Sequence, residues 1–384
     1  SGLADSWYQH DTRGRVIEVK QGDRKVQYVY NDAISRGQLS KVIHADGKET
    51  RFEYDVMGRL RKTHYPDGNS TEVHYDNNGN STELTVPTAA SHTFAYNGVN
   101  KVKSTQAPGS KPTQYHYDRD RRLTAITLPS GQRIEYQYEN GRHVCTQAPE
   151  GTLHYQYQNG NQLRRMYQGD ESIQYRYDGT LLTEVAYQGE LNQRIKYGYN
   201  ADFNVNTLNY AGQQTQLSYD GDKLLTGVHG FDIQRHAQHG LPTSVKRDGY
   251  QQQRIYNDYG EASEINHQQG GVTLQQQLSY NKVGQIVQKI EVVSGTSQAG
   301  TRTYDYDYDN KQRLTQVKLN DQVVEAYDYD ANGNRIEQIR YDRSLDLTTT
   351  QLTEKGVTAA LTAAYGGNLD SQSAGISAVR SFFD

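Results

Sequence analysis

The sequence predicts an all-β protein, a repetitive antiparallel sheet of β-hairpins. The prediction rests on a phrase that recurs along the chain, on the alternation of apolar and polar residues within it, and on the lack of a useful run of helical period before about residue 350. One copy of the phrase, Phe52–Arg61, alternates, turns at Asp55–Gly58 and resumes with Leu60. Because alternate residues face opposite sides of a strand, each copy indicates a strand, a turn and a second strand.

The spacing of the phrase indicates a repeat protein. We call the last tyrosine of each copy its anchor, and successive anchors from Tyr54 to Tyr138 lie 21 residues apart. A period of this size is typical of an architecture in which each repeat is one supersecondary unit. The sixteen predicted anchors are His10, Tyr30, Tyr54, Tyr75, Tyr96, Tyr117, Tyr138, Tyr157, Tyr177, Tyr199, Tyr219, His236, Tyr256, Tyr280, Tyr308 and Tyr329.

Each repeat contains two strands and two turns. Pairs such as Tyr115 and Tyr117 place both rings on one face of a strand and His116 on the other. A polar segment with glycine follows, as in Asp330–Asn334, and then a second alternating run such as Leu123–Leu128. A second turn at dipeptides such as Asp67-Gly68, Asp46-Gly47, Ser130-Gly131 and Asp248-Gly249 leads to the next repeat.

The composition favours a thin sheet. Hydrophobic residues make up 34% of the chain, and its 32 tyrosines far outnumber its six phenylalanines. The mean hydropathy is −0.94. Because tyrosine buries a large ring while its hydroxyl keeps a polar partner, a single sheet layer or the wall of a wide hollow body could have this composition.

Charge and composition argue against several classes of protein. The formal net charge is −4, and lysine and arginine are scattered singly, whereas a face that follows nucleic-acid phosphates needs a basic excess. The sequence has no run of 18 apolar residues, so no membrane-spanning helix is predicted. Cys145, the single cysteine, excludes an internal disulfide and is expected to be a small apolar residue in a strand.

The repeated motif resembles the YD repeat of the Rhs family. Tyr-Asp-x-x-Gly recurs in phase, and the resemblance covers roughly residues 8–342. We expect its residues to be structural, with the tyrosine packed along the sheet and the aspartate accepting backbone donors in the turn. The repeat residues singled out in this way are Tyr54, Asp55, Gly58, Tyr75, Asp76, Gly79, Tyr117, Asp118, Tyr329, Asp330 and Gly333.

The resemblance implies a long sheet that spirals into a hollow shell. Such shells are found in bacterial polymorphic toxins, in the BC component of insecticidal toxin complexes and in the extracellular part of teneurins. In the toxins the shell encloses a C-terminal effector and keeps it unfolded or inactive until delivery. The Asp-Pro-x-Gly type segment that usually closes an Rhs core has no counterpart after Asp342, and sixteen units are few for a closed cocoon. The chain is therefore expected to be either a segment of a larger protein or a smaller open spiral, and the segment is favoured; in both cases the shell would be open or partly closed.

Clusters that could carry chemistry are better explained by structure. Asp305, Asp307 and Asp309 could form a Ca²⁺ site, but a solvated strand face is favoured. His236 and His239 have no third ligand at metal spacing. No metal site, no cofactor and no catalytic residue is predicted. The alternative is a polysaccharide lyase that would use a Tyr/His pair beside an arginine.

Carbohydrate binding is the second reading of the same scaffold. Exposed tyrosine rings beside Asp, Asn and Gln suit stacking and hydrogen bonding to sugars. Trp7, the only tryptophan, is expected either to cap the end of the sheet or to form a sugar-binding platform, and the cap is preferred.

The composition changes near the C-terminus. From Ser344 it shifts to Thr, Ala, Ser and Gly, and the Tyr-x-Tyr pattern stops. Two regions are therefore expected: a YD-repeat sheet over residues 1–343 and a C-terminal cap or partly ordered tail over residues 344–384.

These observations predict a structural role. The chain is expected to be the encapsulating segment of a secreted or cell-surface bacterial Rhs-like protein, a scaffold or shell for a C-terminal toxin cargo. Its partners would be the rest of that polypeptide or the cargo, and glycans under the alternative reading. Neither nucleic acid nor a membrane span is expected.

Overall fold

The computed structural model describes residues 2–31 and 37–341, and it confirms the predicted all-β class. Thirty-two strands follow one another within these residues, and they include no helix. The expected C-terminal cap or tail, residues 344–384, lies outside the described residues. The strands are β1 (Ser6–His10), β2 (Val16–Gln21), β3 (Arg24–Tyr30), β4 (Leu39–Ile43), β5 (Glu49–Tyr54), β6 (Leu60–His64), β7 (Ser70–Tyr75), β8 (Ser81–Thr85), β9 (Ser91–Tyr96), β10 (Val102–Gln106), β11 (Thr113–Tyr117), β12 (Leu123–Thr127), β13 (Arg133–Glu139), β14 (Arg142–Ala148), β15 (Gly151–Gln158), β16 (Gln162–Gln168), β17 (Glu171–Asp178), β18 (Leu181–Gln188), β19 (Gln193–Tyr199), β20 (Val205–Tyr210), β21 (Gln213–Tyr219), β22 (Leu225–Val228), β23 (Phe231–Arg235), β24 (Pro242–Arg247), β25 (Tyr250–Tyr256), β26 (Ala262–Gln269), β27 (Val272–Tyr280), β28 (Ile286–Ser294), β29 (Gly300–Tyr308), β30 (Leu314–Leu319), β31 (Gln322–Tyr329) and β32 (Arg335–Arg340).

Each strand pairs antiparallel with the strands before and after it, so the whole array is one meandering ribbon. Anchor residues lie at or next to the ends of the odd-numbered strands. We call the turn after an odd strand an anchor turn and the turn after an even strand a return turn. In such a meander all anchor turns lie along one edge of the ribbon and all return turns along the other.

A bulge recurs at the same place in every hairpin closed by an anchor turn. In β5 and β6, for example, Glu53 is opposite Lys62 but Tyr54 is opposite Leu60, which leaves Arg61 as the extra residue. Bulges bend the strand that carries them and increase its right-handed twist. Their repetition once per hairpin gives the ribbon a regular source of curvature.

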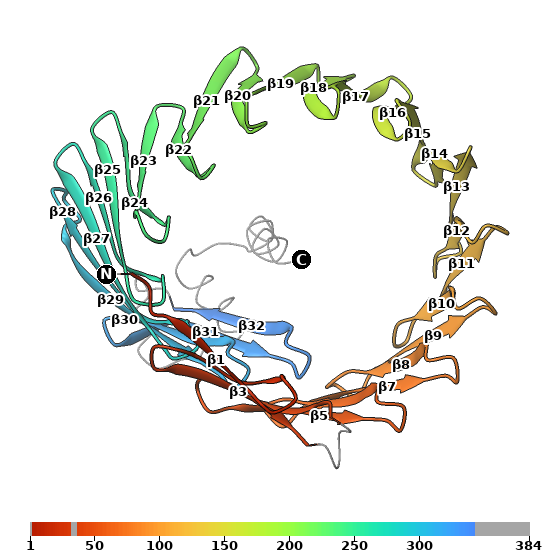
Figure 1. The fold of residues 1–384 in the computed structure, drawn as a ribbon, viewed down its shortest axis with the longest axis horizontal. Coiled ribbons are helices and arrows are strands. Elements are labelled where there is room, and N and C mark those ends of the chain that lie inside the picture. Colours follow the sequence, from red (N-terminus) through yellow and green to blue (C-terminus); the bar gives the residue numbers. More distant parts are fainter. Residues whose placement is uncertain (1, 32–36, 342–384) are drawn as a thin grey trace, which may run out of the picture.

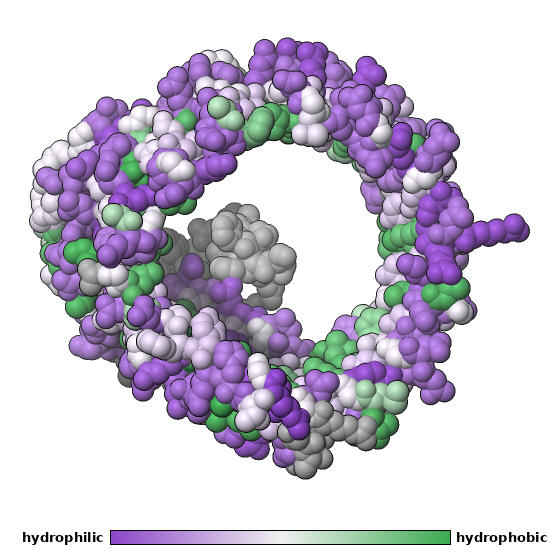
Figure 2. Space-filling view, viewed as in Figure 1, coloured by the Kyte–Doolittle hydropathy of each residue, from purple (hydrophilic) through white to green (hydrophobic). Residues whose placement is uncertain are grey.

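The ribbon spirals around an open space and overlaps itself (Figure 1). Strands β27–β31 lie beside the strands at the start of the chain, and the sheet does not close on itself. Along the visible wall polar residues predominate on the outside, whereas apolar residues gather in patches toward the hollow (Figure 2).

The wall has very little core. Only Ala125, Cys145, Val185, Ala186 and Val317 are buried hydrophobic residues within the described part of the chain. Cys145, which is 5% exposed in β14, is the small apolar strand residue that was predicted. Since little apolar surface is buried, hydrogen bonds along the two edges of the ribbon must contribute much of its stability.

Candidate functional site

The anchor side chains form a ladder along one edge of the ribbon. The hydroxyl of Tyr75 donates to the carbonyl oxygen of Leu60 at 2.7 Å, and Leu60 lies opposite the preceding anchor, Tyr54. Each bond therefore ties a hairpin to the one before it. The same bond, 2.6 to 3.1 Å long, is made by Tyr54, Tyr96, Tyr117, Tyr138, Tyr157, Tyr177, Tyr199, Tyr219, Tyr256, Tyr280, Tyr308 and Tyr329.

The prediction of His236 as an anchor was wrong. Arg235 occupies that position of the ladder, and its Nε donates to the carbonyl oxygen of Leu225 at 2.9 Å. His236 stands where other repeats have the turn aspartate, and its Nδ1 accepts the backbone N–H of Gln238. A guanidinium can replace the phenol here because the position needs a long side chain with a donor at its tip.

The aspartate that follows an anchor holds its turn together. Oδ1 of Asp55 accepts the backbone N–H groups of Met57 and Arg59, both at 2.9 Å, and Oδ2 accepts Nε of Arg59 at 2.6 Å. The hydrogen bond from the Arg59 backbone, together with those from its side chain and from Met57, lowers the pKa of Asp55 despite partial burial. Gly58 lies in the left-handed region at a φ of 80°, where glycine carries no steric penalty.

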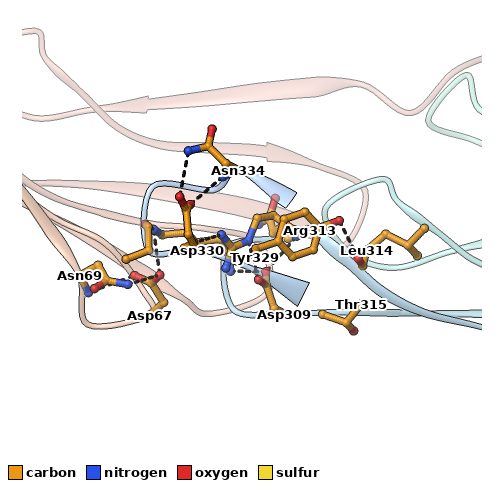
Figure 3. A network of polar contacts seen from close by, with 12 residues as sticks. Asp67, Asn69, Asp309, Arg313, Leu314, Thr315, Tyr329, Asp330 and Asn334 are labelled. Atoms are coloured by element: carbon orange, nitrogen blue, oxygen red, sulfur yellow. Dashed lines mark hydrogen bonds and ion pairs between the residues drawn. The ribbon is translucent and has the colours of Figure 1, made fainter. Parts of the chain in front are cut away.

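The arginine of one turn reaches the next repeat. Nη1 of Arg59 donates to the carbonyl oxygen of Asp76 at 3.1 Å, and its guanidinium lies 4.4 Å from the ring centroid of Tyr75. Arg313 repeats this arrangement with Asp330 and Tyr329 (Figure 3). In the repeats that carry this arginine, the anchor edge thus gains a hydrogen bond and a cation–π contact between neighbouring hairpins, and Arg15 and Arg122 make the same ring contact with Tyr30 and Tyr138.

The second turn of the spiral docks its anchor turns onto return turns of the first, and we call this contact the seam. The anchor turn after β25 meets the return turn after β2, and that after β31 meets the return turn after β8, an offset of 23 strands in both cases. Sequence-distant contacts of this kind join two successive turns of the spiral edge to edge into one stretch of wall.

The best-paired charges of the seam are Arg24 and Glu261, which are 237 residues apart. Two parallel hydrogen bonds of 2.6 and 2.8 Å join the guanidinium to the carboxylate. The side chains are 18% and 19% exposed. The hydrogen bond between them raises the pKa of Arg24 and lowers that of Glu261. Arg24 also lies 3.7 Å from the ring centroid of Tyr259, whose hydroxyl donates to Asp23.

Lys311 forms the second polar centre of the seam. Its Nζ lies 2.9 Å from Oδ2 of Asp67 and donates to the carbonyl oxygen of Ala331 at 2.8 Å. Burial works to raise the pKa of Asp67, but hydrogen bonds from Lys311 and Asn69 together lower it. Figure 3 shows Asp67 and Asn69 beside the turns that carry Asp309 and Asp330. Asn332 bonds Thr88 one hairpin further on.

Other candidates from the sequence do not converge. Asp305 accepts from Gln288, Asp307 pairs with Lys318, and Asp309 serves its own turn. Across residues 2–31 and 37–341, no group of three or more His, Cys, Asp or Glu side chains is placed to hold a metal ion. No helix in that part of the chain is long and apolar enough to cross a membrane.

Trp7 lies on the first strand and is 69% exposed. Its neighbour Tyr8 is 61% exposed but faces the opposite side of β1, so the two rings do not form one platform. Both expectations for Trp7, an end cap or a sugar platform, stay predictions.

Sequence reasoning missed the seam residues. Tyr259, Lys311 and Asn332 all stand two positions after the first polar residue of an anchor turn. In the first spiral turn the same position holds exposed residues such as Met57, which is 76% exposed. The signal that could have found them is that the turn uses only the backbone N–H of this residue, which leaves its side chain available for a contact elsewhere.

The Teneurin YD-shell family model matches residues 4–352. Human teneurin-4 is 26% identical over 197 residues, and mouse teneurin-3 is 25% identical over 201 residues. Each alignment covers 44% of this chain and 7% of the teneurin, so the chain matches only a small part of these relatives.

Solved structures resemble the fold. The crystal structure of TcdB2-TccC3-TEV superposes with a TM-score of 0.69 at 13% identity, covering 88% of this chain and 23% of that one. TcdB2-TccC3-Cdc42 superposes with a TM-score of 0.54 at 12% identity, covering 90% of this chain and 25% of that one.

Proposed function

Because the chain belongs to the Teneurin YD-shell family, we propose that it forms part of the wall of a hollow shell in a larger, secreted bacterial Rhs-like polypeptide. The shell would surround a C-terminal toxin cargo and hold it away from solvent and proteases. The wall segment itself acts as a scaffold.

The observation that carries the proposal is the seam. A ribbon that only curved would leave a gap between successive turns, whereas here the three anchor turns after β25, β29 and β31 are bonded to the return turns beneath them. The contacts include a bidentate ion pair and a mostly buried lysine–aspartate pair. A wall stitched in this way can separate an inner space from the outside.

The thinness of the wall supports the same role. A single layer of strands with a small buried core encloses much space with few residues, and the anchor ladder supplies the stiffness that a thick core would otherwise give. The likeness to TcdB2-TccC3-TEV supports the architecture, and the cargo and secretion are proposed from the Rhs resemblance.

The test is protection of a cargo. A small, protease-sensitive reporter would be fused after Asp384, and its cleavage would be compared with that of the free reporter. We expect cleavage to slow at least tenfold, and to recover in a variant carrying Glu261→Gln and Lys311→Met, which weakens the seam. Cleavage of the fused reporter at the rate of the free one would refute enclosure.

A further inference from the structure

We propose that one face of strands β16–β19 binds an acidic polysaccharide, meaning a sulfated or carboxylated glycan chain. The site is a cluster of Arg165, Arg176, Arg194 and Lys196 around the buried carboxylate of Glu184, which we call the basic cluster. It is separate from the anchor ladder and from the seam.

The register of the sheet brings these residues together. Arg165, Gln174, Ala186 and Arg194 are directly opposite one another in a row across four strands. Arg176, Glu184 and Lys196 form the neighbouring row. Strands lie about 4.8 Å apart, so the four cations fall within about 15 Å on one face. The cluster is a local exception in a chain whose formal net charge is −4.

Glu184 lies close to three of these cations but accepts no hydrogen bond from them, so their N–H donors stay available. Its side chain is only 8% exposed, yet Nε of Arg176 and Nε of Arg194 lie 3.6 Å from Oε1, and Nζ of Lys196 lies 4.0 Å from Oε2. These distances exceed a hydrogen bond, and Oε1 is buried without a hydrogen-bond partner in the described structure. One buried negative charge thus attracts three positive ones, and the cluster keeps a positive surplus.

The cations are available to a ligand. The side chains of Arg176, Arg194 and Lys196 are 67%, 56% and 57% exposed. By contrast, the exposed Arg51 is hydrogen bonded to the carboxylate of Glu49 at 2.8 Å. Guanidinium groups recognise carboxylate and sulfate oxygens through charge-assisted hydrogen bonds, so an anion would take the donors that Glu184 leaves unused.

The surroundings favour a sugar chain over other polyanions. An open hollow of about 360 Å³ adjoins Arg194 and is lined by Ala186, Gln188 and Asn192. This volume is within the range of ligand pockets, and the small Ala186 leaves room between the longer side chains. Amides line it, and Gln174 donates to Gln188 at 2.9 Å beside the row of cations. Neutral amides suit hydroxyl groups, whereas nucleic acid requires a longer basic track with open aromatic platforms.

The experiment uses heparin as the probe and uncharged dextran as its control. Binding to the full chain would be measured by titration calorimetry at two salt concentrations. The site variant carries Arg176→Gln, Arg194→Gln and Lys196→Gln. The matched control carries Arg51→Gln, Arg133→Gln and Lys103→Gln, which remove the same charge at exposed positions elsewhere. Circular dichroism checks that both variants fold.

We expect heparin, but not dextran, to bind the wild-type chain. The site variant should weaken the affinity at least tenfold and reduce its salt dependence, and the control variant should change it less than twofold. An equal loss in both variants would overturn the proposal, because net charge alone would then explain binding. So would the absence of heparin binding, or equally tight, site-dependent binding of single-stranded DNA or polyglutamate.

Discussion

Replacing Glu261 by glutamine should open the seam locally while leaving the rest of the ribbon intact. The carboxylate accepts two hydrogen bonds from Arg24, at 2.6 and 2.8 Å, and one from Nδ2 of Asn257 at 2.8 Å. A glutamine of the same shape keeps one acceptor oxygen, and its NH₂ group then faces N–H donors.

The magnitude follows from the number of charged hydrogen bonds lost. A hydrogen bond to a charged group contributes about 1.5–3 kcal/mol, and the pair is mostly shielded from solvent. Loss of one such bond and weakening of a second should cost about 2–3 kcal/mol. Since 1.4 kcal/mol is a factor of ten, local opening at the seam should become roughly 30- to 150-fold more frequent.

Amide hydrogen exchange read by mass spectrometry is the suitable assay. Long repeat arrays unfold region by region, so a single melting temperature would not isolate one contact, whereas exchange reports each segment. Peptides that cover residues 20–30 and 255–265 should lose protection, and those from β12–β18 should not. A double-mutant cycle with Arg24→Met should give a coupling energy of about 1.5–3 kcal/mol.

Two results would refute this reasoning. A change of less than threefold at both sides of the seam would mean that the ion pair does not hold the two turns together. An equal loss of protection in β12–β18 would mean that the substitution destabilises the ribbon generally, and the seam would not be an independent unit.

Three further predictions concern the ladder, the second seam centre and the turn carboxylates. Tyr75→Phe should lower the hydrogen-exchange protection of residues 60–75 by about 1 kcal/mol, because the hydroxyl's bond to the Leu60 carbonyl is lost. Tyr8→Phe, at an exposed ring, should leave protection unchanged, and equal effects of the two substitutions would argue against the ladder. Lys311→Met should destabilise the contact with Asp67 by about 1–3 kcal/mol, and Met57→Lys at the equivalent exposed position should be neutral, both read by hydrogen exchange. Hydrogen bonds lower the pKa of Asp55, Asp76, Asp118 and Asp330. The stability that these carboxylates give the folded chain is therefore complete above their unfolded pKa and is lost as the pH falls through the lower folded pKa. The urea midpoint should be flat from about pH 7 to 5 and drop below about pH 4, and a drop that begins above pH 5 would contradict this assignment.

The fold was predictable because it is determined by interactions between residues that are close in the sequence. Alternation around Tyr54, the glycine at position 58 and the 21-residue step each act within one hairpin, and a hairpin is determined largely by its own turn and strands. The same locality explains the error at His236. That repeat has no tyrosine at the anchor position, so the sequence pattern led to the nearby aromatic ring of His236. The ladder requires only a donor at the end of a long side chain, which Arg235 provides.

The seam could not be predicted because it depends on accumulated geometry. Which return turn lies under a given anchor turn is decided by the sum of small bends over 23 strands, and an error of a few degrees per hairpin would shift the partner by a whole repeat. No short-range pattern joins Arg24 to Glu261 at a separation of 237 residues. The basic cluster is hidden for a related reason, because Arg176, Glu184 and Lys196 become neighbours only once the register of three strands is known.

The division between local and accumulated geometry also explains how one motif can serve both turns of the spiral. Within an anchor turn, the residue two positions after the aspartate contributes its backbone N–H to the turn, so its side chain is not required there. Met57 is exposed at this position in the first spiral turn, and Lys311 crosses the seam from it in the second. The repeat therefore fixes the hairpin through recurring hydrogen bonds to the turn backbone and leaves this side chain available for the seam, to which Arg24, Glu261 and Asp67 contribute from other positions. Substitutions at this position can therefore strengthen or weaken the seam without removing the hydroxyl-to-carbonyl bonds of the anchor ladder.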